Sequence, residues 1–221
     1  MTNITRIPGG VCAAQGFTAN GIHCGIRKNK TKHDLSVIYS EVKAATACVY
    51  TTNRVKGAPL TVTKNHIADG YAQAVICNSG NANTCNANGI EIAEQMSDLL
   101  GEALHISPAD VVVASTGVIG QTLDITPIES GIPALVAGLS KDGSLNAAYG
   151  IMTTDTKVKE LALEFTVGGK TLTEYLADVD DMGDFKPETN VIHDGYFDES
   201  ADGKRSAPYF DIIIDGITAA Q

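Results

Sequence analysis

Four short apolar runs, each stopped by polar or turn-forming residues, constrain the fold of this chain more than any other feature of its sequence. They occupy residues 35–39, 45–50, 74–77 and 111–114. The third run ends at Asn78-Ser79-Gly80-Asn81, and the fourth ends at Ser115-Thr116-Gly117. Short apolar runs bounded by turn residues are typical of buried strands. We therefore expect a strand at each of the four.

Helical patterns lie between these runs. Apolar residues recur at helical spacing over residues 91–104. Ser107 before Pro108 predicts the N-cap of the next element. Residues 127–139 predict another helix, with Thr126 as its cap and Gly138 near its end. Strands that alternate with helices predict an α/β fold built in layers.

The composition supports such a core. Apolar residues make up 43 % of the 221 residues and charged residues 19 %, which is ordinary for a soluble globular protein. Tryptophan is absent and aromatic residues make up 5 %, so the core is built mainly from Ala, Val, Ile and Leu. The length suffices for one domain with a sizeable core, or for one large and one small unit.

Several classes of protein are disfavoured. No apolar stretch approaches the roughly 18 residues that a membrane span needs, and residues 1–10 lack the apolar segment of a signal peptide. The five cysteines form no CxxC pair and no metal-type spacing, so we expect free thiols in a reducing cytoplasm. The sequence has no GxxxxGK(S/T) or GxGxxG loop. We expect neither a metal nor a cofactor.

Charge is distributed unevenly. Residues 171–221 carry 12 acidic and 3 basic groups, a net charge of −9, whereas residues 1–170 carry 14 acidic and 13 basic groups, a net charge of −1. We place a soft boundary near Lys170, between a domain of residues 1–170 and a divergent, partly disordered acidic tail of residues 171–221. The apolar run 210–214 predicts one final strand in that tail. Phosphate backbones repel such a tail, so we expect no nucleic-acid partner.

The two strand ends are the first candidate sites. Residues 78–83 place small and amide side chains directly after a buried strand, which either makes a binding turn or an Asn/Gly loop that satisfies its own backbone. Residues 115–120 combine Thr116 with Gly117 and Gly120. A threonine hydroxyl and a backbone N–H at such a turn can stabilise the oxyanion of acyl transfer, although an ordinary turn has the same pattern.

A third cluster, Met152-Thr153-Thr154-Asp155-Thr156-Lys157, surrounds a carboxylate with hydroxyl groups. These groups can orient a polar substrate. They can also form a helix cap or a strand end, in which Asp155 binds backbone N–H groups.

Together these segments resemble one family, the ornithine acetyltransferases (glutamate N-acetyltransferases). The motifs that carry the resemblance follow one another in the family's order: Asp34-Leu35-Ser36 to Tyr39, Ala45-Thr46-Ala47 with Thr51-Thr52-Asn53, residues 78–83, residues 115–120 and Met152-Thr153-Thr154-Asp155-Thr156. The match covers roughly residues 9–160 and corresponds to the N-terminal (α-chain) part of the family.

The resemblance implies an autoprocessed, layered α/β fold shared with certain aminopeptidases. In the family, a precursor cuts itself before a threonine, which becomes the first residue of a β chain and the nucleophile. That threonine takes acetyl from N-acetylornithine and passes it to glutamate, and some members accept acetyl-CoA. Thr116 and Gly117 match the family's oxyanion hole, and either Thr153 or Thr154 matches its α-chain substrate contact. A β chain or second subunit is the implied partner.

The chain also departs from the family. The KGSGM-type stretch and the PNMAT-type cleavage motif do not occur in it, and Lys157-Val158-Lys159 lacks the usual central proline. Thr189 lies at roughly the expected distance for a nucleophile, but Glu188 precedes it where the family has a small residue. No nucleophile is therefore identified.

Three interpretations follow. In the first, the chain is an acetyltransferase subunit that supplies the oxyanion hole while another chain supplies the nucleophile. In the second, it is a truncated or non-catalytic homologue that binds a ligand or a partner. In the third, it is an unrelated hydrolase of the same autoprocessing fold, which the ordered motifs disfavour.

Overall fold

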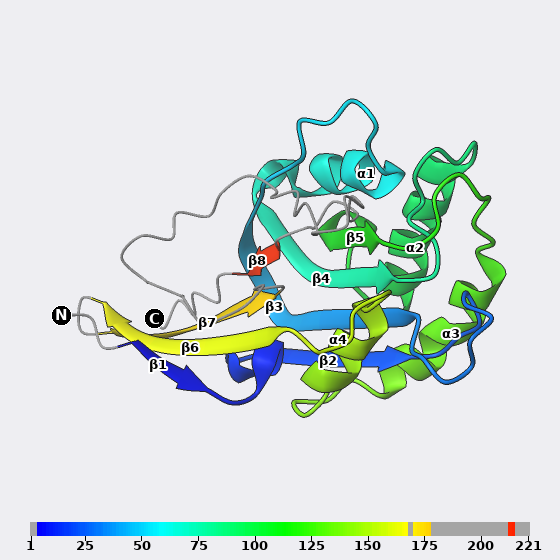
Figure 1. The fold of residues 1–221 in the computed structure, drawn as a ribbon. Coiled ribbons are helices and arrows are strands. Elements are labelled where there is room, and N and C mark those ends of the chain that lie inside the picture. The colour runs from blue at the N-terminus through cyan, green and yellow to red at the C-terminus, as the bar shows by residue number, and fades with distance from the viewer. Residues whose placement is uncertain (1–3, 168–169, 178–211, 215–221) are drawn as a thin grey trace, which may run out of the picture.

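The computed structural model describes residues 4–167, 170–177 and 212–214, which form two sheets and the helices around them (Figure 1). The strands are β1 (Ile4–Ile7), β2 (Phe17–Ile22), β3 (Leu35–Cys48), β4 (Tyr71–Asn78), β5 (Val111–Ser115), β6 (Glu160–Val167), β7 (Lys170–Ala177) and β8 (Ile212–Ile214). The α-helices are α1 (Ala58–His66), α2 (Gly89–Leu104), α3 (Thr126–Ala137) and α4 (Ser144–Ile151). Short 3-10 helices cover Gly10–Ala13, Ile67–Asp69 and Pro108–Asp110.

The larger sheet has the order β2-β3-β4-β5. Strand β3 runs antiparallel to both β2 and β4. Strands β4 and β5 run parallel, with Asn78 opposite Ser115 at their ends. Parallel strands need a crossover connection, and here α2 lies between them in the chain. The carboxyl ends of β4 and β5 therefore lie side by side.

The main core lies between this sheet and the helices α1, α2 and α3 (Figure 1). Alternate residues of β3, Leu35 and Val37, point into it. Helix α2 contributes Ile92, Met96 and Leu100, which are spaced four residues apart and are at most 5 % exposed. The spacing puts them on one face of the helix, so the predicted helical pattern and the predicted aliphatic core are both confirmed.

Helix α4 packs on the opposite face of the sheet, against β2 and β3. Ala147 of α4 joins Val11 and Ala19 in a small second core. A third cluster on the sheet contains Ala72, Val75 and Val112. Residues 74–77 of β4 and 111–113 of β5 are buried on both faces of the sheet, so these stretches are continuously apolar rather than alternating.

The smaller sheet has the order β1-β6-β7 and is antiparallel. Strands β6 and β7 pair along their full length, with Val167 opposite Lys170. The hairpin thus spans the position at which we placed the soft boundary. The division into residues 1–170 and an acidic tail stays a prediction, because residues 178–211 and 215–221 lie outside the described part of the chain.

Two predicted elements need correction. The runs 35–39 and 45–50 are not separate strands, because residues 35–48 form the single 14-residue strand β3 and the last two residues of the second run lie beyond its end. The register of β3 against β4 shifts between Tyr39 and Ala44. Thr126 is not the cap of its helix but its first residue, and its N–H donates to Asp124 Oδ1 at 3.0 Å. Ser107 is confirmed as a cap, because its Oγ accepts from the N–H of Ala109. Ile212–Ile214 pairs with β3, so part of the predicted final strand is confirmed.

Candidate active site

The parallel pairing of β4 and β5 brings two of the predicted motifs together. Asn78 Nδ2 donates to Ser115 Oγ over 2.6 Å, and the N–H of Thr116 donates to the Asn78 carbonyl over 2.9 Å. Further along, the N–H of Ala82 donates to the carbonyl of Val118. Residues 78–83 and 115–120 therefore lie side by side at the end of the sheet. We call these two segments together the wall.

The 78–83 loop satisfies much of its own backbone. Asn78 Oδ1 accepts from the N–H groups of Gly80 and Asn81, at 3.2 and 3.0 Å. Asn81 Oδ1 accepts from the N–H of Asn83 at 2.7 Å. Asn78 and Asn83 are fully buried. The expectation of an Asn/Gly loop that satisfies its own backbone is confirmed at these N–H groups. The side chains of Asn78 and Asn81 therefore hold the shape of the loop.

Gly117 lies directly on this loop. Its φ is +125°, a conformation that L side chains rarely adopt, and a Cβ atom there would lie 2.8 Å from the Gly80 carbonyl carbon. Within the described part of the chain, neither the Gly117 N–H nor the half-buried Thr116 hydroxyl has a hydrogen-bond partner. Val118 and Ile119, which follow, are about half exposed. The turn is thus fixed in shape while two of its donors stay available.

The third motif begins where α4 ends. Asp155 Oδ2 accepts from the N–H of Thr153 at 2.9 Å, and Asp155 Oδ1 lies 3.2 Å from Lys159 Nζ. Burial raises the pKa of Asp155, but the Thr153 N–H and the Lys159 ammonium outweigh burial and hold it below its usual value. Asp155 therefore binds a backbone N–H group of its own turn, as the structural alternative predicts. Thr153 is half-buried and Thr154 is exposed.

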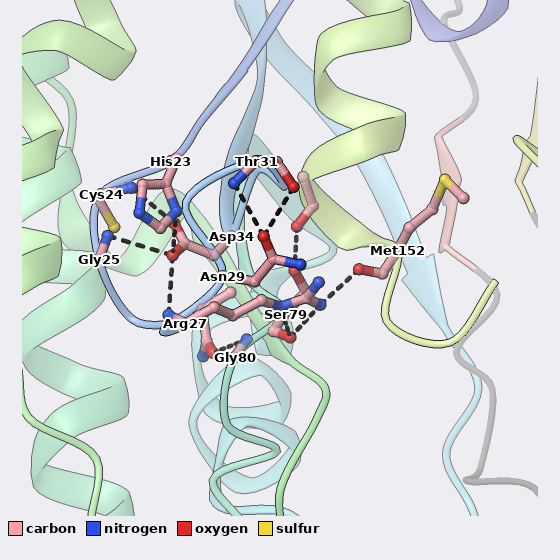
Figure 2. Close-up of polar contacts among 12 residues, drawn as sticks. His23, Cys24, Gly25, Arg27, Asn29, Thr31, Asp34, Ser79, Gly80 and Met152 are labelled. Carbon is pink, nitrogen blue, oxygen red and sulfur yellow. Dashed lines mark hydrogen bonds and ion pairs between the residues drawn. The ribbon is translucent and has the colours of Figure 1, made fainter. Parts of the chain in front are cut away.

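A residue that the sequence did not single out connects these motifs. Arg27 Nε donates to the Ser79 carbonyl at 2.7 Å, and Arg27 Nη2 donates to the same carbonyl and to the Met152 carbonyl (Figure 2). Ser79 Oγ donates to the Gly150 carbonyl at 2.5 Å. The loop after β4 is thereby joined to the end of α4, from which Thr153 follows.

Arg27 is itself held by Asp34, the residue before β3. The Asp34 carboxylate is fully buried and accepts from the N–H groups of Cys24, Gly25 and Arg27, at 2.7, 3.2 and 2.9 Å (Figure 2). His23 Nδ1 lies 3.0 Å from it. Burial lowers the pKa of Arg27, although the nearby charges of Asp34 and Asp155 oppose that effect.

A cavity of about 540 Å³ opens at the N-terminal ends of α1 and α2, and Asn83 of the wall is among its lining residues. Its lining includes Lys56, Asn86 and Glu91 but none of Thr116, Gly117, Thr153 or Thr154. The hydrogen bonds of the wall, rather than this cavity, mark the candidate site. Thr189, the weakest candidate from the sequence, lies outside the described residues. None of the described helices is long and apolar enough to cross a membrane.

Comparison with known proteins identifies the family. The sequence model of the ArgJ family matches residues 18–176. The chain belongs to the ArgJ family. It is 44 % identical over 180 residues to the arginine biosynthesis bifunctional protein ArgJ of Caldanaerobacter subterraneus, and 43 % identical over 169 residues to the glutamate N-acetyltransferase of Methanocaldococcus jannaschii. The first alignment covers 81 % of this chain and 42 % of that relative, and the second covers 75 % and 40 %.

Solved ArgJ-family structures share the fold. The crystal structure of ArgJ from Bacillus halodurans matches with a TM-score of 0.73 at 39 % identity, over 79 % of this chain and 92 % of that one. The ornithine acetyltransferase of Mycobacterium tuberculosis, crystallised with ornithine, matches with a TM-score of 0.69 at 31 % identity, over 78 % and 93 %. The predicted family and the α/β fold are confirmed. The roles of Thr116, Gly117, Thr153 and Thr154 stay predictions.

Proposed function

We propose that this ArgJ-family chain forms the oxyanion-stabilising half of an acetyltransferase site that moves acetyl from N-acetylornithine to glutamate. One observation carries the proposal. The Thr116 hydroxyl and the Gly117 N–H have no partner among the described residues, on a turn whose shape is fixed by Asn78 and Gly80. Donors held in place before charge develops are what acyl transfer requires.

The chemistry proceeds in two steps. A threonine oxygen attacks the acetyl carbonyl of N-acetylornithine, the C–N bond breaks, and ornithine leaves with its amine protonated. The amine of glutamate then attacks the acetyl ester, which releases N-acetylglutamate and restores the threonine hydroxyl. Thr116 and Gly117 stabilise the oxyanion in both steps, and Thr153 or Thr154 contacts the substrate.

The nucleophile comes from a second chain in this proposal. The chain covers 92 % of the matching chain from Bacillus halodurans but 42 % of the Caldanaerobacter relative. The solved ArgJ chain is thus about as long as the matched region, whereas the relative's sequence is more than twice as long. These lengths support an enzyme that is divided into separate chains. Autocatalytic cleavage of a precursor, acetyl-CoA as a second donor and a cytoplasmic location belong to the same proposal and rest on the family resemblance.

The test is complementation. This chain is co-expressed with the C-terminal part of the Caldanaerobacter ArgJ, and transfer from N-acetylornithine to labelled glutamate is measured. We expect turnover in the mixture and none with either chain alone. The Thr116→Val variant should lower kcat about 100-fold with little change in KM, and Thr116→Ser should restore much of it.

The alternative of a non-catalytic homologue makes the opposite prediction. It requires that the mixture shows no turnover although the two chains co-purify. A Thr116→Val variant with full activity would refute the oxyanion role even if the mixture is active.

A further inference from the structure

Three segments that are distant in the sequence meet at the Arg27 side chain. The guanidinium donates to the carbonyl of Ser79, in the loop after β4, and to the carbonyl of Met152, at the end of α4. The main chain of Arg27 belongs to the connection between β2 and β3. Within the described residues, both contacts of the guanidinium are to main-chain oxygens, so the side chain acts on where these backbones lie (Figure 2).

Asp34 holds the main chain of Arg27 in place. Its carboxylate accepts from three N–H groups in the 24–27 segment, including that of Arg27 itself. The Asp34 carbonyl also accepts from the N–H of Ser79 at 3.0 Å. Arg27 and the loop it contacts are therefore positioned by the same residue, and the guanidinium has little freedom to move away.

The same loop supports the candidate oxyanion turn. Gly80 is packed between two neighbours, because a Cβ atom on it would overlap the side chain of Ile26. On its other side, a Cβ atom added to Gly117 would lie 2.8 Å from the Gly80 carbonyl carbon, so the two backbones approach each other closely. A shift of the 79–80 peptide would thus move the support of Gly117.

We infer that Arg27 is a positioning residue that sets the spacing between the Thr116-Gly117 turn and the Thr153-Thr154 pair. It does so through the Ser79 and Met152 carbonyls and does not itself contact substrate. The inference rests on the proposed function for the meaning of that spacing, but the link itself is a property of this chain.

The guanidinium suits this task. Its N–H donors lie in one rigid plane, so two of them can hold carbonyls that belong to different segments. A lysine ammonium at the same place would keep the charge but has no counterpart of Nε, the second nitrogen that donates to the Ser79 carbonyl. We therefore expect Arg27→Lys to retain part of the link and Arg27→Met to lose it.

Hydrogen–deuterium exchange of the chain tests the link without any need for activity. The variants are Arg27→Met and Arg27→Lys, and Lys28→Met is the matched control, because Lys28 is an exposed neighbour in the same connection. We expect amides 79–81 and 153–155 to exchange at least about tenfold faster in Arg27→Met, and less so in Arg27→Lys. Amides of α2 should be unchanged, as should all amides in the control. A uniform acceleration across the fold, or no change at 153–155, would overturn the inference.

Kinetics of the complemented enzyme separate positioning from general stability. If Arg27 sets where Thr153 and Thr154 lie, Arg27→Met should raise KM for N-acetylornithine about tenfold, and Arg27→Lys should recover part of that increase. A role only in stability would instead reduce the amount of active enzyme, with KM unchanged, and would overturn the inference. Localised exchange in an inactive mixture would support the link while removing the proposed function.

Discussion

The Asn78 side chain ties together the ends of two parallel strands, because its Nδ2 donates to Ser115 Oγ over 2.6 Å. The same side chain accepts from two N–H groups of its own loop through Oδ1. One fully buried amide therefore fixes both halves of the candidate wall. Asn78 is the last residue of β4, and this position lets its uncharged side chain contact both β5 and the loop that follows β4.

Replacement of Asn78 should be costly. Asn78→Ala leaves two N–H groups without their acceptor and Ser115 without its donor, and each buried unsatisfied group costs about 1–3 kcal/mol. We expect the free energy of unfolding to fall by about 3 kcal/mol in urea titrations. Ser115→Ala removes one contact and should cost about 1 kcal/mol. Equal losses in the two variants would show that the loop contacts of Asn78 contribute nothing.

Gly117 and Gly120 form a matched pair for backbone strain. Both have positive φ, at +125° and +74°, but a Cβ atom on Gly120 would meet nothing within 4 Å. Gly120→Ala should therefore cost about 1 kcal/mol of stability from strain alone. Gly117→Ala adds overlap with the Gly80 peptide, and its φ lies farther from the left-handed well, so it should cost about 3 kcal/mol. Chemical denaturation of both variants measures the difference, and similar values would mean that the Gly80 peptide moves away freely.

The Asp34 carboxylate should contribute to stability through the N–H groups that it accepts from, although it forms no ion pair with the Arg27 guanidinium. Asparagine has one acceptor oxygen in place of two, so Asp34→Asn cannot accept from all three N–H groups of the 24–27 segment. We expect the free energy of unfolding to fall by about 2 kcal/mol. Asp142→Asn, at an exposed position, serves as the control and should change stability by less than about 0.5 kcal/mol. If the two variants unfold alike, the buried carboxylate does not organise this segment.

The buried Cys77 thiol should make stability fall at high pH. Burial raises its pKa from 9.0 to about 12, and the positive charge of Arg27 offsets that only in part. Between about pH 9 and 12 the thiol is therefore ionised in the unfolded chain but protonated in the folded one, so the unfolded chain binds fewer protons and stability falls as pH rises. The loss should approach about 1.4 kcal/mol per pH unit.

Cys77→Ala isolates this contribution. Urea denaturation from pH 8 to 10.5 should give a shallower decline in the variant than in the unaltered chain. Parallel declines would contradict the assignment, because other groups that titrate in this range are common to both proteins.

Parts of the fold follow directly from the sequence, and others depend on packing that the sequence does not display. The ends of β4 and β5 were predicted because each apolar run stops at turn residues. Strand β2 was missed because Asn20 and Gly21 are poor strand formers, yet Gly21 is required where the Asn146 carbonyl of α4 approaches. Strand β3 was divided in two because its exposed middle, Glu41 and Lys43, interrupts the apolar pattern.

The candidate site shows the same division. Thr116, Gly117 and the Thr153-Thr154 pair can be proposed as candidates from the sequence because hydroxyl and glycine residues cluster in short segments, and their roles stay predictions. Arg27 was missed because its partners are main-chain carbonyls, which no sequence motif encodes. Asp34 lies within a motif of the family resemblance, but its contacts to residues 24–27 depend on how the β2–β3 connection folds back.

The location of the acetyl group tests the central claim most directly. The complemented mixture is incubated with N-acetylornithine without glutamate, and the intact mass of each chain is measured. Our account predicts one acetyl group on the N-terminal threonine of the partner chain and none on this chain. An acetyl group on this chain, at Thr189 or elsewhere, or no acetylation of either chain, would contradict it.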